Sequence, residues 1–323
     1  MKDYGRFFKG NLKIPFKSTL PTHMGSVDER KLIFVEDEEK LYLGKSDQWV
    51  YFSGKDNPKN INYDITVTVG SGGDFSTINQ ALEYLSHYYP LYVKSGFTAE
   101  VKLLTGFVMA EQVLIYGVDL GWIDIISEDS SVTINRSALT ITDAAYYPAF
   151  SAFKYGKLPN IRTLFNMDSS GDSSGRVGIY LHEGGQCNIT NGGVKNTPTA
   201  GCLIYRGGFA IMYEADFSYS YYGVKLLRGG YLESQHLNVS HCTDYGLLAQ
   251  FGCNVDAQET NAQHCNFGVS SQSGSVMNVG SSDARECTTY GFHVGGASIL
   301  MTSGVKGTLS QTIRTITVAG III

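Results

Sequence analysis

Three ionisable residues recur at one phase of the chain and are candidates for acid/base chemistry. Glu214, His236 and Glu259 are separated by 22 and 23 residues. If the chain repeats with this period, their side chains form a column of carboxylate, imidazole and carboxylate, one repeat apart. His and Glu are frequent general acids and bases in enzymes. The alternative is a solvated row of charges on an outer wall, which would leave the same pattern in the sequence.

A second candidate for catalysis is a pair of carboxylates two residues apart. On one strand, Glu214 and Asp216 would point to the same face with their Cα atoms about 6.5 Å apart. The carboxyl groups of inverting glycosidases are about 6.5–9.5 Å apart. The sequence therefore predicts Glu214, Asp216 and His236 as catalytic candidates for cleavage of a glycan.

The segment 201–222 is also suited to binding sugars, because it combines tyrosines with charged side chains. Aromatic rings stack on the apolar faces of sugars, and carboxylates and arginines hold hydroxyl groups. The alternative is that these tyrosines pack between subunits. The glycan-binding candidates are Tyr205, Arg206, Tyr213, Tyr219 and Tyr221, together with Glu259.

Two rows of glycines define the repeat that would position these residues. The first row is Gly178, Gly201, Gly223, Gly246, Gly268 and Gly291, and the second is Gly184, Gly207, Gly229, Gly252, Gly274 and Gly296. Between the glycines lie short apolar runs without helical periodicity, so strands are expected. Several short strands in each 22–23-residue repeat predict an all-β, right-handed parallel β-helix. Leucine-rich repeats share the period, but their consensus is absent.

Residues at equal phase are expected to stack in ladders along the β-helix. The predicted ladders are an aromatic one (Tyr222, Tyr245, Phe267, Tyr290), a thiol one (Cys242, Cys265, Cys287) and a turn-capping one (Asp216, Asn238, Asn261, Asp283). His241 and His264 precede two of the cysteines. Because neighbouring strand residues point to opposite faces, such His and Cys side chains would not converge on a metal ion. We therefore expect core thiols beside exposed histidines, with no metal site.

Composition narrows the class of protein further. The chain has 323 residues, 43% hydrophobic content and a net charge of −5, with scattered Lys and Arg, so nucleic-acid binding is not expected. The longest apolar run, residues 316–323, is far shorter than the ~20 residues of a membrane span. The N-terminus lacks a signal-like apolar stretch, and six cysteines without a framework spacing indicate reduced thiols made in a cytoplasm. No nucleotide-binding or hydrolase motif is present, and no cofactor is expected.

The chain divides into four predicted regions. Residues 1–63 lack the repeat and predict a small three-stranded meander followed by a linker. Residues 64–100 predict a strand and a capping helix, with Ser76 or Thr77 as its N-cap. Residues 101–310 are the β-helix. Residues 311–323 form an apolar tail that must be covered, either as a cap on the last coil or at a subunit interface.

Two segments resemble known families. Residues 66–82, with Gly-Ser-Gly-Gly-Asp-Phe at 70–75, are similar to the opening of pectin-methylesterase and pectate-lyase-like β-helices. Residues 20–52 resemble a module of bacteriophage tail fibres and tailspikes, with Leu-Pro at 20–21, Arg-Lys-Leu-Ile-Phe-Val at 30–35, Lys-Leu-Tyr at 40–42 and Trp-Val at 49–50. The usual Asn-Gly or Asp-Gly turn is replaced by Gly-Lys-Ser-Asp at 44–47.

The order of these modules resembles a phage tailspike. The resemblance implies a homotrimer in the virion tail, attached to tail or baseplate proteins through residues 1–60, that recognises a bacterial surface polysaccharide. It supplies no catalytic residues, because the signatures of polygalacturonase-like hydrolases and the Asp pair of pectin esterases are absent. A receptor-binding protein is therefore expected first, with a polysaccharide depolymerase and a purely structural appendage as alternatives.

Overall fold

The computed structural model consists of two units. It describes residues 63–90, 97–143 and 146–308, together with the strands at 16–17, 32–35, 40–45, 48–54, 59–61 and 320–322. The first unit comprises residues 1–60 and 86–89, and the second comprises residues 61–85 and 90–323.

The first unit contains a small four-stranded sheet. Its strands are β1 (Phe16–Lys17), β2 (Leu32–Val35), β3 (Lys40–Lys45) and β4 (Gln48–Gly54), in that order. Strands β2, β3 and β4 pair antiparallel, as predicted for the meander, and β1 adds to it in parallel. A further short pair joins β5 (Lys59–Ile61) to β7 (Tyr88–Pro90).

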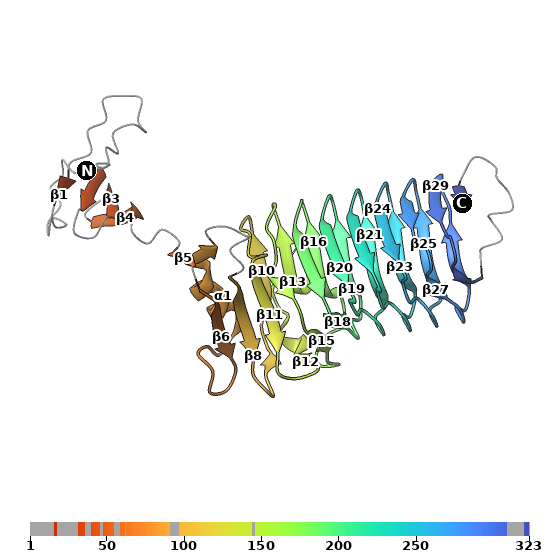
Figure 1. Cartoon of the computed structure of the whole chain (residues 1–323), viewed down its shortest axis with the longest axis horizontal. Coiled ribbons are helices and arrows are strands. Elements are labelled where there is room, and N and C mark those ends of the chain that lie inside the picture. Colours follow the sequence, from red (N-terminus) through yellow and green to blue (C-terminus); the bar gives the residue numbers. More distant parts are fainter. Residues whose placement is uncertain are drawn as a thin grey trace, which may run out of the picture. The chain divides into compact units, whose positions relative to one another are not determined.

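The second unit is a right-handed parallel β-helix whose coils stack from β6 to β29 (Figure 1). One wall is an eight-stranded sheet of β10 (Val113–Tyr116), β13 (Tyr147–Phe153), β16 (Arg176–His182), β19 (Ala200–Tyr205), β21 (Tyr222–Leu227), β23 (Tyr245–Gln250), β25 (Phe267–Gln272) and β28 (Tyr290–Val294).

The second wall is an eleven-stranded sheet. It contains β6 (Ile65–Val69), β8 (Ala99–Leu103), β11 (Ile123–Ser127), β14 (Asn160–Ile161), β17 (Gln186–Thr190), β20 (Phe209–Tyr213), β22 (Tyr231–Gln235), β24 (Asn254–Gln258), β26 (Val276–Asn278), β29 (Ser298–Met301) and β31 (Gly320–Ile322). Because β6 belongs to this sheet, the β-helix begins at residue 65 and not at the predicted boundary of 101.

A narrow third wall closes each coil. It contains β9 (Val108–Met109), β12 (Val132–Ile134), β15 (Leu164–Met167) and β18 (Gly193–Lys195), and further along the pair β27 (Asp283–Ala284) and β30 (Lys306–Gly307). A 3₁₀ turn at Arg136–Ala138 follows β12. Between β18 and β27 the wall continues as single bridges joining Asp216, Asn238, Asn261 and Asp283.

The two glycine rows have different physical reasons. A Cβ on Gly223 would lie 2.5 Å from the carbonyl oxygen of Gly246 in the next coil, so the first row allows close approach of successive coils. Gly229, from the second row, has φ +78° and nothing near its Cβ position, so the second row serves turns with left-handed backbone.

Helix α1 (Ile78–Ser86) lies at the β6 end of the stack, as predicted for a cap (Figure 1). It buries the expected stripe of Ile78, Ala81, Leu82 and Leu85. Thr77 is the N-cap, because its hydroxyl accepts the Gln80 N–H at 3.2 Å. Such a cap covers the apolar cross-section that the first coil would otherwise expose.

The predicted aromatic and thiol ladders are both present. Ring centroids are 5.9 Å apart for Tyr222 and Tyr245, and 4.6 Å apart for Tyr245 and Phe267. These rings are half-buried on the outer face of the eight-stranded sheet. Cys242, Cys265 and Cys287 all direct their thiols to backbone carbonyls of the preceding coil. All six cysteines are free, consistent with core thiols.

The end of the chain extends the second wall. Strand β31 pairs in parallel with β29, with Ile321 opposite Ile299. This pairing agrees with the first of the two roles expected for the apolar tail, covering of the last coil. Residues 309–319 and 323 lie outside the described part of the chain, and the predicted interfacial role stays a prediction.

Candidate functional site

The predicted site residues lie in the turns between the walls or at the strand ends beside them, and these turns form three columns along the β-helix. Column A follows the eleven-stranded sheet and contains Glu214, His236 and Glu259. Column B follows the third wall and contains Tyr219, His241, His264 and Glu286. Column C follows the eight-stranded sheet and contains Arg206, Arg228 and Phe251. All ten residues have left-handed backbone, with φ between +47° and +63°.

The repeated backbone conformation explains why the side chains stack. Equal φ values at equal phase send the Cα–Cβ bonds of a column in the same direction. Successive coils are joined by parallel pairing, which places them about 4.8 Å apart. Within column A, the Glu214 N–H donates to Gln235 O at 3.0 Å and the His236 N–H to Gln258 O at 3.3 Å. The predicted column of Glu214, His236 and Glu259 is therefore formed.

The centre of column A is an exposed ion pair beside an aromatic ring. His236 Nδ1 lies 2.7 Å from Glu259 Oε2, and each side chain retains 42% of its exposure. The Tyr213 ring, at the end of β20, meets the His236 ring edge-on with centroids 5.7 Å apart. Glu214 lies one coil before His236, and its carboxylate has no bonded partner among the described residues. The structure thus brings Tyr213, His236 and Glu259 together.

The expected carboxylate pair is not formed. Strand β20 ends at Tyr213, so Glu214 and Asp216 do not share a strand face as predicted. Glu214 stands in the left-handed turn instead. Asp216 caps a turn: its Oδ1 accepts the Ser218 N–H at 2.9 Å and the Asn238 amide at 3.1 Å. The shared strand face on which the glycosidase prediction rested is therefore absent from this pair.

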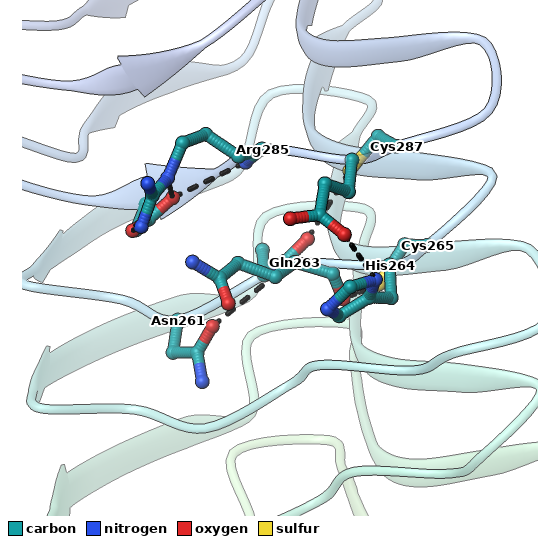
Figure 2. A network of polar contacts seen from close by, with 9 residues as sticks. Asn261, Gln263, His264, Cys265, Arg285 and Cys287 are labelled. Carbon is teal, nitrogen blue, oxygen red and sulfur yellow. Dashed lines mark hydrogen bonds and ion pairs between the residues drawn. The ribbon is translucent and has the colours of Figure 1, made fainter.

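Asp216 instead begins the predicted turn-capping ladder. Asn238, Asn261 and Asp283 follow at equal phase, each accepting the N–H two residues further on. Arg285 bonds Asp283 at 2.7 Å and holds the pKa of that carboxyl well below its usual range. In each coil this ladder lies in the chain between column A and column B. Figure 2 shows Asn261 of the ladder, together with Arg285.

Column B is a stack of rings that ends on a carboxylate. The Tyr219 and His241 rings are 4.8 Å apart with an interplanar angle of 3°, and His241 and His264 are 4.5 Å apart at 11°. His264 Nδ1 then lies 3.2 Å from Glu286 Oε2 (Figure 2). Because the rings cover one another's faces, a ligand meets mainly their edges and ring N–H groups.

The histidines of column B are separated from the thiols next to them. His264 and Cys265 are neighbours in the chain (Figure 2), but His264 is exposed, whereas Cys265 is buried and its thiol bonds Val239 O at 3.3 Å. The reason differs from the predicted strand alternation, because His264 occupies a left-handed turn. In the described ranges, no group of three or more His, Cys, Asp or Glu side chains is placed to hold a metal ion.

Columns A and B and the ladder between them make one surface, here called the polar face. It carries three of the seven histidines of the chain and the exposed pairs His236–Glu259 and His264–Glu286. Carboxylates and imidazoles of this kind can bind sugar hydroxyls, and a paired imidazole can transfer a proton.

The other predicted residues lie elsewhere on the coil. Tyr205 is the last residue of β19, and Arg206 follows it in column C. Column C precedes strand β20 and column A follows that strand, so the two columns lie at opposite ends of β20. Tyr221 lies just before β21, where its ring meets Tyr222 edge-on at 4.8 Å. The tyrosine-rich coil therefore spreads its residues around the circumference and does not gather them at one site.

Sequence reasoning did not select four of the polar residues of these columns as binding groups. His241, His264 and Glu286 keep the 22- and 23-residue spacing that starts at Tyr219, and Arg228 follows Arg206 by 22 residues. The signal was therefore present: applying the repeat to each predicted residue would have found all four.

Comparison with protein-family models supports the fold of the β-helix. A family model described as a right handed beta helix region matches residues 166–304. A solved structure of ORF18 from Geobacillus virus E2 is similar at 12% identity, covering 86% of this chain and 68% of that one, with a TM-score of 0.28. No curated protein matches the chain. Among the described helices, none has the length and apolar character of a membrane span.

Proposed function

We propose that this chain is a bacteriophage tailspike or tail-fibre protein that binds a bacterial surface polysaccharide on the outer wall of its β-helix. The observation that carries the proposal is the group of Tyr213, His236 and Glu259, which is exposed and held by a rigid turn. An aromatic ring beside a carboxylate and an imidazole offers both contacts that a sugar needs, one apolar and one polar.

The repeating architecture fits a polymeric ligand. Columns A and B run along the axis, so a polysaccharide lying in the same direction meets similar chemistry at each coil. Binding energy can then be distributed over several weak contacts. The rigid backbone of the coils reduces the ordering cost of binding, which favours affinity.

The resemblance of residues 20–52 to a phage tail module supports attachment to the virion. In this proposal, residues 1–60 bind tail or baseplate proteins, the chain acts as a homotrimer, and the protein is located in the virion tail. The β-helix then carries the surface that contacts the bacterium.

A second candidate function is depolymerisation of the bound glycan by hydrolysis or elimination. It rests on the 2.7 Å contact between His236 and Glu259, a pair that can hold and move a proton. With Asp216 engaged as a turn cap, Glu214 is the unpartnered carboxylate next to this imidazole. A depolymerase would therefore use His236 with Glu214 or Glu259.

The test screens the labelled, purified protein for adsorption to a panel of bacterial strains and incubates it with capsule and lipopolysaccharide isolated from the same strains. Fragment size, reducing ends and retained binding are followed over hours. Intact glycan with retained binding supports the adhesin. Shortened glycan supports the depolymerase, and His236→Ala should then lose cleavage together with either Glu214→Ala or Glu259→Ala. Absence of adsorption and of cleavage contradicts both and favours a structural appendage.

A further inference from the structure

A second surface on the β-helix, here called the Arg corner, carries two arginines around one aromatic ring. Arg206 and Arg228 occupy the same turn in successive coils of column C, and both side chains are exposed. Their guanidinium carbons lie 5.0 Å and 5.5 Å from the centroid of the Tyr205 ring. Two cations are therefore held on one ring, one coil apart.

These two arginines have no charged partner among the described residues. Other exposed arginines of the β-helix do: Arg162 bonds Asp124 at 2.8 Å, and Arg285 bonds Asp283 at 2.7 Å. Glu183 occupies the equivalent turn one coil before Arg206, and the described part of the chain shows no ion pair between these two side chains. Like charges held close together repel, so an anion between them would be stabilised.

Aromatic side chains flank the corner on several sides. Phe251 follows Arg228 in column C and is 55% exposed. On the eleven-stranded sheet, the rings of Phe209 and Tyr231 stack with centroids 5.0 Å apart, each three residues after one of the arginines. The two cations thus contact the Tyr205 ring, and further aromatic residues follow within three residues or one coil, an arrangement suited to a ligand with both an oxyanion and an apolar face.

We propose that the Arg corner binds the oxyanion, carboxylate or phosphate, of an acidic sugar in the recognised polysaccharide. The planar guanidinium fork matches the two oxygens of such a group, and the rings contact the sugar to which it is attached. The proposal rests on the proposed function and specifies its ligand class. The proposal also assigns different roles to the Arg corner and the polar face, because the carboxylates of the polar face disfavour binding of an anionic group there.

The experiment measures binding of short oligogalacturonides, glycerol-phosphate oligomers and neutral malto-oligosaccharides to the full chain by calorimetry or ligand-observed NMR. The variants are Arg206→Gln/Arg228→Gln and the corresponding double Lys variant. Arg162→Gln is the matched control, because it removes an exposed arginine that already has a carboxylate partner. Circular dichroism of each variant verifies the fold.

We expect at least one acidic probe to bind better than the neutral one, and its affinity to fall at least tenfold in the double Gln variant. The double Lys variant should retain part of the affinity, and Arg162→Gln all of it. Preference for oligogalacturonides identifies a carboxylate ligand, and preference for glycerol-phosphate oligomers a phosphate ligand.

Two results would overturn the inference: no acidic probe binding in preference to the neutral one, or equal binding by the parent and the double Gln variant. If the protein still adsorbs to bacterial polysaccharide in either case, the proposed function stands without this site. If adsorption to bacteria is also absent, the proposed function fails with it.

Discussion

Two His–carboxylate pairs of the same β-helix differ almost entirely in their surroundings. His236 and Glu259 are 2.7 Å apart and each is 42% exposed, whereas His182 and Asp143 are 3.0 Å apart and only 7% and 11% exposed. The buried His182 ring also lies between Tyr180 and Phe153, at 4.5 Å and 5.1 Å. The same kind of histidine–carboxylate pair can therefore stabilise packing when it is buried and remain accessible to a ligand when it is exposed.

The partners of each pair explain this difference. Asp143 comes from the segment before β13, outside the repeat, and also accepts a hydrogen bond from the Ser151 hydroxyl. His182 ends β16 on the outer face of the eight-stranded sheet. The pair thus fastens a segment onto that sheet. Both members of the exposed pair are turn residues of consecutive coils, and the chain path does not depend on their contact.

The largest expected effect is the loss of stability when the buried pair is broken. Asp143→Ala leaves the His182 ring buried without its partner, and we expect a cost of about 3 kcal/mol in unfolding free energy. Urea unfolding followed by circular dichroism measures it. Glu259→Gln is the matched control in the exposed pair and should change stability by less than about 0.5 kcal/mol. Equal effects of the two substitutions would contradict the comparison.

The pH dependence of stability should also come from the buried pair. Burial would raise the pKa of Asp143, but its bonds to His182 and Ser151 and the charge of His182 outweigh burial and hold that pKa below its ordinary value. Its contribution is therefore present above the unfolded-state pKa and is lost as pH falls through the folded-state pKa. We expect the parent to lose stability in acid more steeply than Asp143→Asn, measured by melting temperature below pH 5. Parallel curves would contradict this assignment.

Substitutions in the exposed pair, His236 and Glu259, should lower the affinity for glycan and leave the unfolding free energy nearly unchanged. If the polar face binds glycan, His236→Ala removes a hydrogen-bonding group and an edge contact with Tyr213, and affinity should fall about tenfold, or 1.4 kcal/mol. Binding to isolated bacterial polysaccharide measures this, with unfolding as a second readout. A variant that binds as the parent does would remove column A from the site, and a variant that unfolds would give the exposed pair a structural role.

The sequence predicts the features that recur with the 22–23-residue period. Its wrong predictions concern features that the period does not determine. The glycine rows, the ladder from Asp216 and the column from Glu214 follow from phase alone, because equal phase means equal backbone. Phase does not tell where a strand stops, and so Glu214 was expected on a strand when it stands in a turn. Phase also does not tell on which wall of the coil a residue lies. For this reason Tyr205 and Tyr213 were predicted to belong to one glycan-binding site, although they end different strands.

Contacts from outside the repeat leave no periodic signal. Asp143 has no counterpart one coil later, and nothing in the spacing connects it to His182. Strand β6 precedes the first regular glycine, and its place in the eleven-stranded sheet depends on pairing with β8. Long-range partners of this kind are determined by the folded chain path, which one sequence does not reveal.

The smallest expected effect belongs to the last pair on the polar face, His264 and Glu286. Their contact is 3.2 Å, and Glu286 is 70% exposed, so Glu286→Gln should change stability by less than about 0.5 kcal/mol. The informative measurement for this variant is its affinity for polysaccharide. If a polysaccharide spans columns A and B, this substitution should weaken binding two- to threefold while His236→Ala weakens it more. If Glu286→Gln leaves binding unchanged and His236→Ala does not, column A alone contacts the glycan, and the ring stack from Tyr219 to His264 has only a packing role.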